Sequence, residues 1–212
     1  MDRLVNKTVV SGLILGIALC LLALAGSKQL AAAQVRDPIV VLETTRGRIV
    51  MRIYESLVPY TADNFLDLVD EGFYNGLTFH RVENWVIQGG DPNGNGSGCY
   101  VDRQTGRPRY LKLETHPMLN HNSAGTVAMA RGQSPNSASC QFYILKRGMP
   151  QLNGKYAVFG KVFQGMNTVL SIGPGDRIIS ASIVSSNGSH SQSEGAQQSE
   201  PRQAGPTGDP GF

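Results

Sequence analysis

Short runs of β-branched and aromatic residues recur along the middle of this 212-residue chain, and they restrict its fold more than any other feature does. Only two segments, 59–71 and 166–172, show a helical spacing of apolar residues. The β-rich runs predict strands at residues 39–43, 49–54, 78–82, 85–88, 126–130, 141–145, 157–163 and 177–184. Many short strands with few helices predict a mainly β domain, either an antiparallel barrel or a sandwich.

The two ends of the chain differ from this middle region. Residues 1–33 begin with a short charged segment and continue in an apolar run from Val9 to Ala25, which is typical of a secretory leader. The run is long for a signal peptide and barely long enough to span a bilayer, so a cleaved signal, an uncleaved anchor and a buried core helix stay open. Residues 185–212 are rich in Ser, Gly, Gln, Pro and Glu, which predicts a disordered tail. We therefore expect an extracytoplasmic protein with one domain over residues 34–184.

Several classes of function are disfavoured by what the sequence lacks. The formal net charge is only +3, and no Lys/Arg-rich run or basic helix face is present, so nucleic acid is not an expected partner. The histidines are scattered, and neither a His-Glu-x-x-His nor a Cys-x-x-Cys motif occurs, so no metal or other cofactor is expected. The glycine-rich segment 94–98 lacks the Lys-Ser/Thr pair and the helix that follow a phosphate-binding loop, and no Gly-x-Ser-x-Gly elbow of a hydrolase is found.

One ordered set of motifs carries a family resemblance. Phe79-His80-Arg81 is followed, after a short spacer, by an aromatic residue and by Gln88-Gly89-Gly90-Asp91. Further motifs follow in the same order at residues 95–98, 125–130, 135–137, 141–144, 152–155 and 158–162. With these motifs, residues 39–184 resemble the cyclophilin family of peptidyl-prolyl cis-trans isomerases. The resemblance implies a closed eight-stranded antiparallel barrel, capped by two helices, with a peptide groove on its outer face.

The resemblance also implies the site residues. Arg81 and Gln88 are similar to the catalytic arginine and to the glutamine that holds the substrate backbone. The implied substrate-binding residues are Trp85, Val86, Ala130, Arg131, Gly132, Gln141, Tyr143, Leu152 and Tyr156. Taken singly, each of these would be an ordinary surface or core residue, and only their order along the chain indicates a site.

Elementary chemistry is consistent with this set of residues. Rotation about a prolyl bond is slowed by amide resonance, with a barrier of roughly 18–20 kcal/mol, and no bond has to be broken. An enzyme therefore needs no nucleophile and must only bind the twisted state better than either planar state. A fixed guanidinium such as that of Arg81 stays charged and can donate to the twisted amide.

Three departures from the family pattern bear on the site. The spacer Val82-Glu83-Asn84 is one residue shorter than usual, and Trp85 replaces the usual phenylalanine. Gln151 stands where many members carry a tryptophan on which cyclosporin binding depends, so we expect weak inhibition by that drug. Cys99 and Cys140 lie in segments that are neighbours in the family, which suggests a disulfide, although two separate thiols stay open.

Three functions are therefore in competition. The first is an isomerase that assists the folding of exported proteins by acting on proline-containing polypeptides. The second is a non-catalytic module that binds extended Pro-containing peptides, and the third is a structural domain anchored to a membrane by its N-terminal segment. No oligomerising segment is evident, so a monomer is expected.

Overall fold

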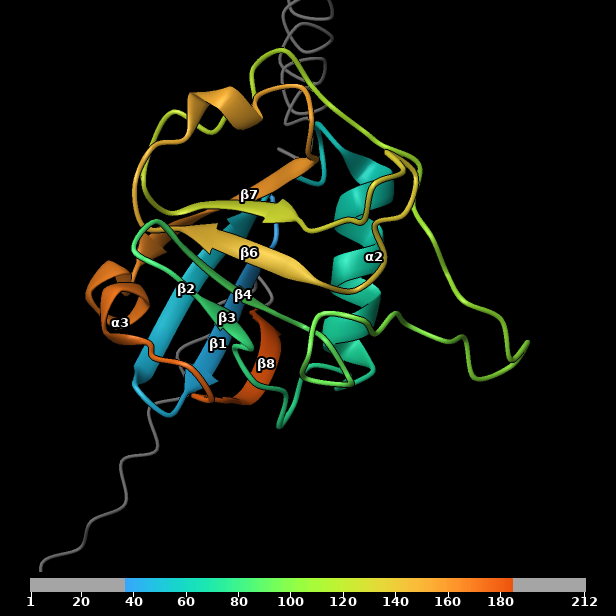
Figure 1. The fold of residues 1–212 in the computed structure, drawn as a ribbon, viewed down its shortest axis with the longest axis horizontal. Helices are drawn as coiled ribbons and strands as arrows, with labels where there is room; N and C mark the ends of the chain where they lie inside the picture. The colour runs from blue at the N-terminus through green and yellow to red at the C-terminus, as the bar shows by residue number, and fades with distance from the viewer. Residues whose placement is uncertain (1–36, 185–212) are drawn as a thin grey trace, which may run out of the picture.

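The computed structural model describes residues 37–184, which form one curled antiparallel sheet with two α-helices and one 3-10 helix. The strands are β1 (Ile39–Thr44), β2 (Gly47–Ile53), β3 (Arg81–Val82), β4 (Val86–Gly89), β5 (Thr126–Met129), β6 (Phe142–Leu145), β7 (Val158–Gln164) and β8 (Ile178–Val184). The helices are α2 (Pro59–Asp70), η1 (Pro150–Leu152) and α3 (Met166–Ser171). Helices α2 and α3 lie at opposite ends of the curled sheet (Figure 1). The predicted leader, 1–33, and the predicted tail, 185–212, lie outside the described residues.

The strand order β3-β4-β6-β5-β7-β2-β1-β8 gives a half-barrel, so the closed barrel implied by the family resemblance is wrong. Within the described residues, β3 and β8 stand at the two ends of this order and form no ladder with each other. The physical reason is that β3 is only two residues long. The segment before β3 meets the segment before β8 at an isolated bridge, Thr78↔Arg177, and through a hydrogen bond of 2.8 Å from Phe79 N to Asp176 O.

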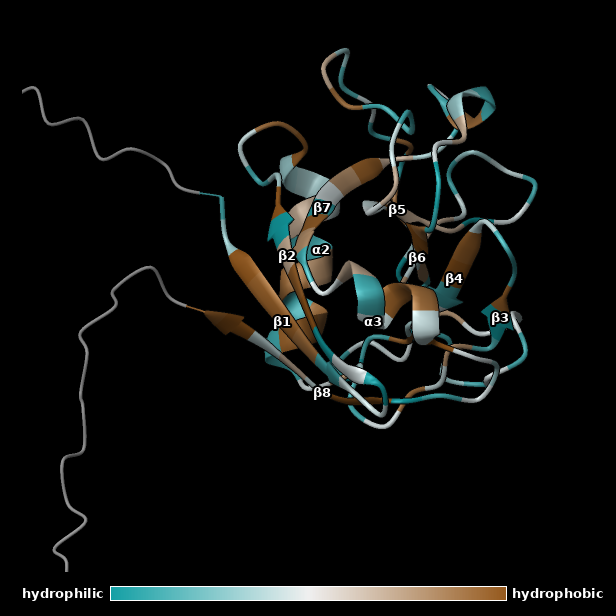
Figure 2. Ribbon diagram, turned by 90° about the vertical axis from the view of Figure 1, so that its left-hand side faces the viewer, coloured by the Kyte–Doolittle hydropathy of each residue, from teal (hydrophilic) through white to brown (hydrophobic). Residues whose placement is uncertain are grey.

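The main core fills the inside of the curled sheet. Phe65 of α2 points into it, and its ring centroid lies 4.9 Å from that of Phe159 and 5.4 Å from that of Phe142. All three side chains are fully buried, and burial of such large rings is the dominant favourable term in folding. Figure 2 shows the hydrophobic colour concentrated on the strands and the hydrophilic colour mostly on the connecting loops.

Local interactions determine where helix α2 begins and where it ends. Pro59 occupies the first turn, where a missing N–H costs nothing. The N-cap residue, Val58, has no side-chain acceptor, and the carboxylate of Glu114 instead accepts a hydrogen bond of 2.8 Å from Thr61 N. After the helix, Gly72 adopts a φ of 67°, a left-handed conformation that glycine adopts without strain.

The outer face of β4, β5 and β6 carries a second apolar cluster. Side chains alternate between the two faces of a strand, yet every residue of β5 and β6 is buried. The outward-facing members of this cluster are Val86, Ala128, Tyr143, Leu145 and Val158, and Leu152 and Tyr156 pack against them. The sheet is therefore covered on its outside by the segment that follows β6, and this covered face is where the predicted site lies.

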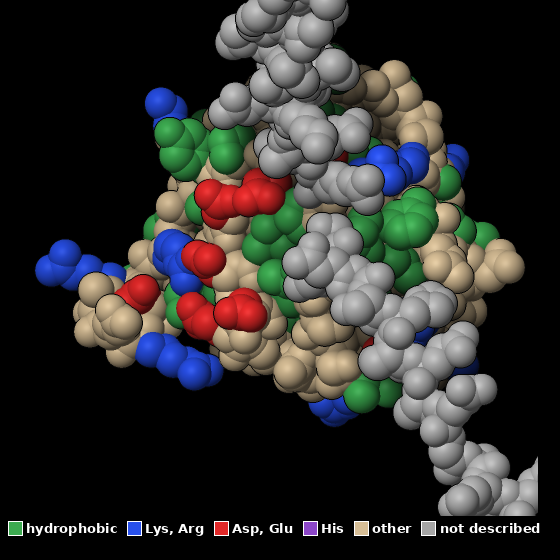
Figure 3. Space-filling view, turned by 180° about the vertical axis from the view of Figure 1, so that it is seen from behind, with side chains coloured by type: hydrophobic (Ala, Val, Ile, Leu, Met, Phe, Trp, Pro, Cys, Tyr) green, Lys and Arg blue, Asp and Glu red, His purple; other side chains and the backbone are tan. Residues whose placement is uncertain are grey.

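The back of the molecule has a different surface. Figure 3 shows acidic side chains gathered on one flank with basic side chains beside them, and apolar side chains toward the middle of that face. Within residues 37–184, no helix combines the length and the apolar character that crossing a membrane requires.

Candidate active site

Pairing of β3 with β4 brings Arg81 and Gln88 together. The hairpin places Arg81 directly opposite Gln88, and Glu83 N donates to Val86 O (2.9 Å) to close the turn. Directly opposed residues point to the same face of a sheet, so both side chains face outward. Arg81 Nη1 donates to Gln88 Oε1 at 3.3 Å. The two predicted catalytic side chains are therefore in contact.

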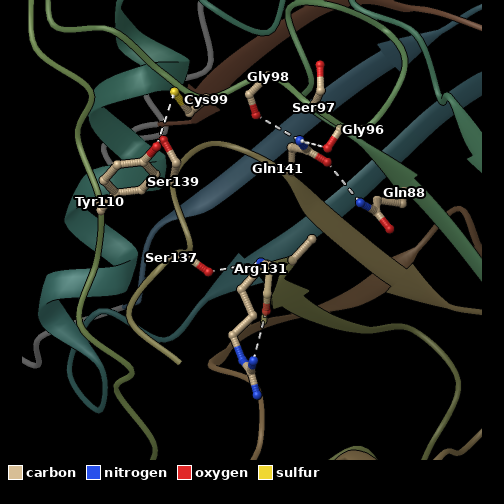
Figure 4. A pocket seen from close by; sticks show the side chains of 12 residues that line it. Gln88, Gly96, Ser97, Gly98, Cys99, Tyr110, Arg131, Ser137, Ser139 and Gln141 are labelled. Atoms are coloured by element: carbon tan, nitrogen blue, oxygen red, sulfur yellow. Dashed lines mark hydrogen bonds between the residues drawn. The ribbon is translucent and has the colours of Figure 1, made fainter. Parts of the chain in front are cut away.

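A relay of amide hydrogen bonds continues from Gln88 across the groove. Gln88 Nε2 donates to Gln141 Oε1 (2.9 Å), and Gln141 Nε2 donates to the carbonyl oxygens of Gly96 (3.0 Å) and Gly98 (2.8 Å). Figure 4 shows this relay running from Gln88 through Gln141 to the glycine loop. The relay fixes which end of each amide is the donor, and it leaves the side chain of Gln88 held between Arg81 and Gln141.

The glycine loop itself is shaped by Asp91. This buried carboxylate accepts hydrogen bonds from the backbone N–H groups of Asn93 (3.1 Å), Asn95 (2.8 Å) and Gly96. Burial raises the pKa of Asp91, but the backbone donors of Asn93, Gly96 and Asn95 together outweigh it, so the pKa is lowered. Asp91 is therefore a charged structural centre that holds one rim of the groove.

A pocket of about 350 Å³ lies between Arg81 and the segment after β6. Its walls include seven of the predicted substrate-binding residues: Trp85, Val86, Ala130, Arg131, Tyr143, Leu152 and Tyr156. Arg131 is the charged member of this set, and the other six form the part of the pocket that we call the apolar chamber. Arg81 Cζ lies 5.2 Å from the centroid of the Trp85 ring, which places the guanidinium at the edge of the apolar chamber. The chamber is of a size and character that suit a small apolar ring.

Arg131 holds the far wall of this pocket. Its guanidinium stacks over the ring of Tyr156, with Cζ 4.7 Å from the ring centroid, and its Nε donates to Lys155 O (2.9 Å). Tyr156 in turn meets Tyr143 edge to face, with centroids 5.9 Å apart. Arg131 therefore contributes to the pocket by fixing an aromatic wall.

A second pocket of about 270 Å³ adjoins the first, and the two share Gln88, Gly96, Ala130 and Arg131. Gly132 lies in this second pocket, away from the apolar chamber. The family resemblance implies that the segment from Ala130 to Gly132 binds substrate, and an extended peptide could pair with its backbone. However, Ala130 N donates to Gln141 O (2.9 Å) and Gly132 N donates to Ser137 Oγ (3.0 Å). Both of these N–H groups are thus engaged within the chain, and pairing with a peptide would use other groups of the segment.

Sequence reasoning missed a buried hydrogen-bond network behind the apolar chamber. His121 is fully buried, and its Nε2 lies 2.9 Å from the hydroxyl of Tyr143. Asn153 Oδ1 accepts from His121 N (2.7 Å) and lies 3.3 Å from Nδ1, which puts the ring proton on Nδ1 and makes Nε2 the acceptor for Tyr143. Burial lowers the pKa of His121 and keeps the ring neutral. One signal was available in the sequence, since a tyrosine rather than a wholly apolar ring in a pocket wall requires a hydrogen-bond partner.

Two further residues of the site were also missed. His80 lines the apolar chamber, burial lowers its pKa, and neither of its buried ring nitrogens has a hydrogen-bond partner within the described residues. Glu83 accepts hydrogen bonds from Arg81 Nε (2.7 Å) and from Trp85 Nε1 (2.6 Å). Glu83 lies in the shortened spacer, which was the signal in the sequence that this part of the site differs.

The suggested disulfide is not formed, because Cys99 and Cys140 are both free thiols. Cys140 is fully buried, and burial raises its pKa to about 12. Cys99 Sγ instead lies 3.8 Å from the hydroxyl of Tyr110 on the wall of the second pocket. Among residues 37–184, no group of three His, Cys, Asp or Glu side chains is placed so that it could hold a metal ion.

Comparisons with known proteins agree with this geometry. The family model described as cyclophilin type peptidyl-prolyl cis-trans isomerase/CLD matches residues 39–188. A peptidyl-prolyl cis-trans isomerase of Schizosaccharomyces pombe is 39% identical over 136 residues, which are 62% of this chain and 83% of that protein. Peptidyl-prolyl cis-trans isomerase-like 1 of Homo sapiens is 39% identical over 142 residues, which are 65% of this chain and 81% of that protein.

A solved structure is similar as well. The crystal structure of a Cryptosporidium parvum cyclophilin type peptidyl-prolyl cis-trans isomerase, determined in the presence of the dipeptide Ala-Pro, has a TM-score of 0.62 and 32% sequence identity. The similarity covers 69% of this chain and 99% of that one. Fold, family model and relatives therefore agree that the chain belongs to the cyclophilin-type peptidyl-prolyl cis-trans isomerases.

Proposed function

We propose that this protein catalyses rotation about X-Pro bonds with Arg81 as the catalytic residue, and that its substrates are proline-containing segments of exported proteins. The observation that supports the role of Arg81 is its position at the edge of the apolar chamber, beside Gln88 and across from Tyr143 and Leu152. A proline ring in the chamber would place its preceding carbonyl within reach of donors from the rim.

The mechanism follows from what changes in the amide as it twists. In the planar states the nitrogen lone pair is delocalised, whereas in the twisted state it is localised and the nitrogen becomes basic. A hydrogen bond from a guanidinium therefore stabilises the twisted amide more than either planar amide, and only such a difference in stabilisation accelerates the reaction. The apolar walls hold the proline ring, while Gln88, fixed by Gln141, holds the backbone on the side that rotates.

The test is a prolyl isomerisation assay on the full chain, comparing the wild type with Arg81→Ala. Because removal of one preorganised donor in an active site typically costs on the order of 100-fold in rate, we expect a loss of that size. Arg48→Ala is the matched control, since Arg48 is an exposed arginine paired with Glu43 on the β1–β2 hairpin, distant in the fold from the chamber. A wild type that binds proline-containing peptides without any rate above the uncatalysed one would instead favour a non-catalytic binding module.

Export is a separate part of the proposal, and it rests on the apolar run from Val9 to Ala25. Intact-mass analysis of the protein recovered from its native host distinguishes the two forms of export. A product that begins between residues 26 and 34 supports a cleaved signal, whereas a full-length product in the membrane fraction supports an anchor. A full-length product in the cytosol would contradict export. We also propose a monomer, which light scattering of the purified chain would test.

A further inference from the structure

The carboxylate of Glu83 connects two side chains of the catalytic rim. Oε1 accepts from Arg81 Nε at 2.7 Å, and Oε2 accepts from the indole Nε1 of Trp85 at 2.6 Å. The same Arg81 and Trp85 also stack on each other, with 5.2 Å between Cζ and the ring centroid. Arginine, glutamate and tryptophan thus form a closed triangle in which every pair is in contact.

The chemistry of this triangle requires a carboxylate. Both Arg81 Nε and Trp85 Nε1 can only donate, so the group between them must accept at both of its ends. A carboxylate has two acceptor oxygens, whereas the amide of glutamine has one oxygen and one NH₂ group that would face a donor. Both hydrogen bonds are charge-assisted because the acceptor is an ionised carboxylate, and the bond from Arg81 has a charged donor as well. The pKa of Glu83 is lowered, first of all by the hydrogen bond from Arg81.

The triangle matters because Arg81 has little else to hold it. Its side chain is 45% exposed, and apart from Glu83 its one hydrogen bond within the described residues is the 3.3 Å contact with Gln88. An exposed arginine samples many rotamers, and ordering it costs free energy. With Nε bound to Glu83 and Nη1 bound to Gln88, the planar fork is fixed at two points and Nη2 remains for a substrate.

We propose that Glu83 is a positioning residue for catalysis, which uses Trp85 as its second anchor to fix the guanidinium of Arg81 at the rim of the proline chamber. This inference rests on the proposed isomerase function. It also explains two sequence features together: the shortened spacer brings Glu83 between its partners, and tryptophan supplies the N–H that a phenylalanine at position 85 would lack.

The experiment compares Glu83→Gln in two backgrounds by the prolyl isomerisation rate of the full chain. In the wild-type background we expect kcat/KM to fall about 5-fold, mostly through kcat, since the chamber walls are unchanged and an exposed charged pair has a modest effect. In a Trp85→Phe background Arg81 Nε is the one donor left, and the single oxygen of the glutamine can accept from it. The same substitution should therefore lower kcat/KM by less than about 2-fold in that background. Glu43→Gln is the matched control, because Glu43 also accepts from an arginine Nε (2.6 Å), that of Arg48.

Two kinetic outcomes would overturn the proposal. Glu83→Gln with the activity of Glu43→Gln would show that Arg81 needs no positioning, and an equal cost in both backgrounds would remove Trp85 from the arrangement. A rate of zero in the wild type would instead refute the proposed function, and a spectroscopic measurement then tests the triangle separately. Trp85 is the single tryptophan of the chain, so its indole N–H gives one NMR signal. That signal should shift in Glu83→Gln and stay in Glu43→Gln, and an unchanged position in Glu83→Gln would refute the triangle whatever the activity.

Discussion

Replacement of Tyr143 by phenylalanine tests the buried network behind the apolar chamber. The substitution keeps the ring in the chamber wall and removes only the hydroxyl, which lies 2.9 Å from His121 Nε2. His121 has no exposed surface and Tyr143 is only 5% exposed, so water cannot take the place of the lost donor. An unsatisfied buried acceptor costs about 1–3 kcal/mol, and we expect a loss of about 2 kcal/mol in the free energy of unfolding.

The measurement is urea denaturation followed by far-UV circular dichroism, with thermal melting as a second readout. For a domain of this size, a loss of about 2 kcal/mol corresponds to a fall of about 4–8 °C in the melting temperature. Tyr60→Phe is the matched control because Tyr60 is 78% exposed, so loss of its hydroxyl should change stability by less than about 0.5 kcal/mol. Equal stabilities of Tyr143→Phe and the wild type would refute the assignment of Tyr143 as the donor to His121.

Two further predictions concern backbone packing and pH. Gly90→Ala should destabilise the domain by about 3 kcal/mol more than Gly76→Ala in urea denaturation. Both glycines have a φ of 82°, so the strain from a left-handed conformation is the same at the two positions. A Cβ at position 90 would lie 2.6 Å from the carbonyl oxygen of Cys140, whereas a Cβ at position 76 would meet no atom within 4 Å. Equal losses of unfolding free energy in the two variants would contradict this argument. Burial lowers the pKa of His80 and His121 below 6.5, so below that pH the unfolded chain binds more protons than the folded one. The free energy of unfolding should therefore be nearly level above about pH 7.5 and fall increasingly steeply from there toward about pH 5.5, and a rise on acidification would refute this sign.

Much of the fold could be predicted because the strand pattern is local. The structure confirms strands in all eight predicted segments, and it confirms both predicted helices within one residue at each end. In the segment 78–82 the observed strand is much shorter than predicted, since only Arg81 and Val82 form a strand there. Thr78 turns toward Arg177 instead, and no local pattern in the sequence distinguishes a ladder from a single bridge between distant segments. For the same reason, open and closed sheets could not be separated from the sequence alone.

The site could be predicted only as far as the family pattern reaches. The pattern indicated Arg81, Gln88 and Gln141, and the structure brings these side chains into one chain of hydrogen bonds. It did not indicate Glu83, because a glutamate two residues after an arginine on a strand usually marks an ordinary solvated pair. Nor did it indicate His121, whose partners Tyr143 and Asn153 lie 22 and 32 residues away in sequence.

Stability and function are coupled on the outer face of the half-barrel. The apolar residues that β4, β5 and β6 present outward must be covered, and the segment from Met149 to Tyr156 covers them while it forms a wall of the chamber. His121 ties that segment in place, since its carbonyl accepts from Met149 N (2.7 Å) and its backbone N–H donates to Asn153. Substitutions in this network should therefore alter both unfolding and substrate affinity. In contrast, Glu83 itself should be replaceable with an effect on catalysis and almost none on unfolding, because both side chains of its ion pair with Arg81 are exposed to solvent.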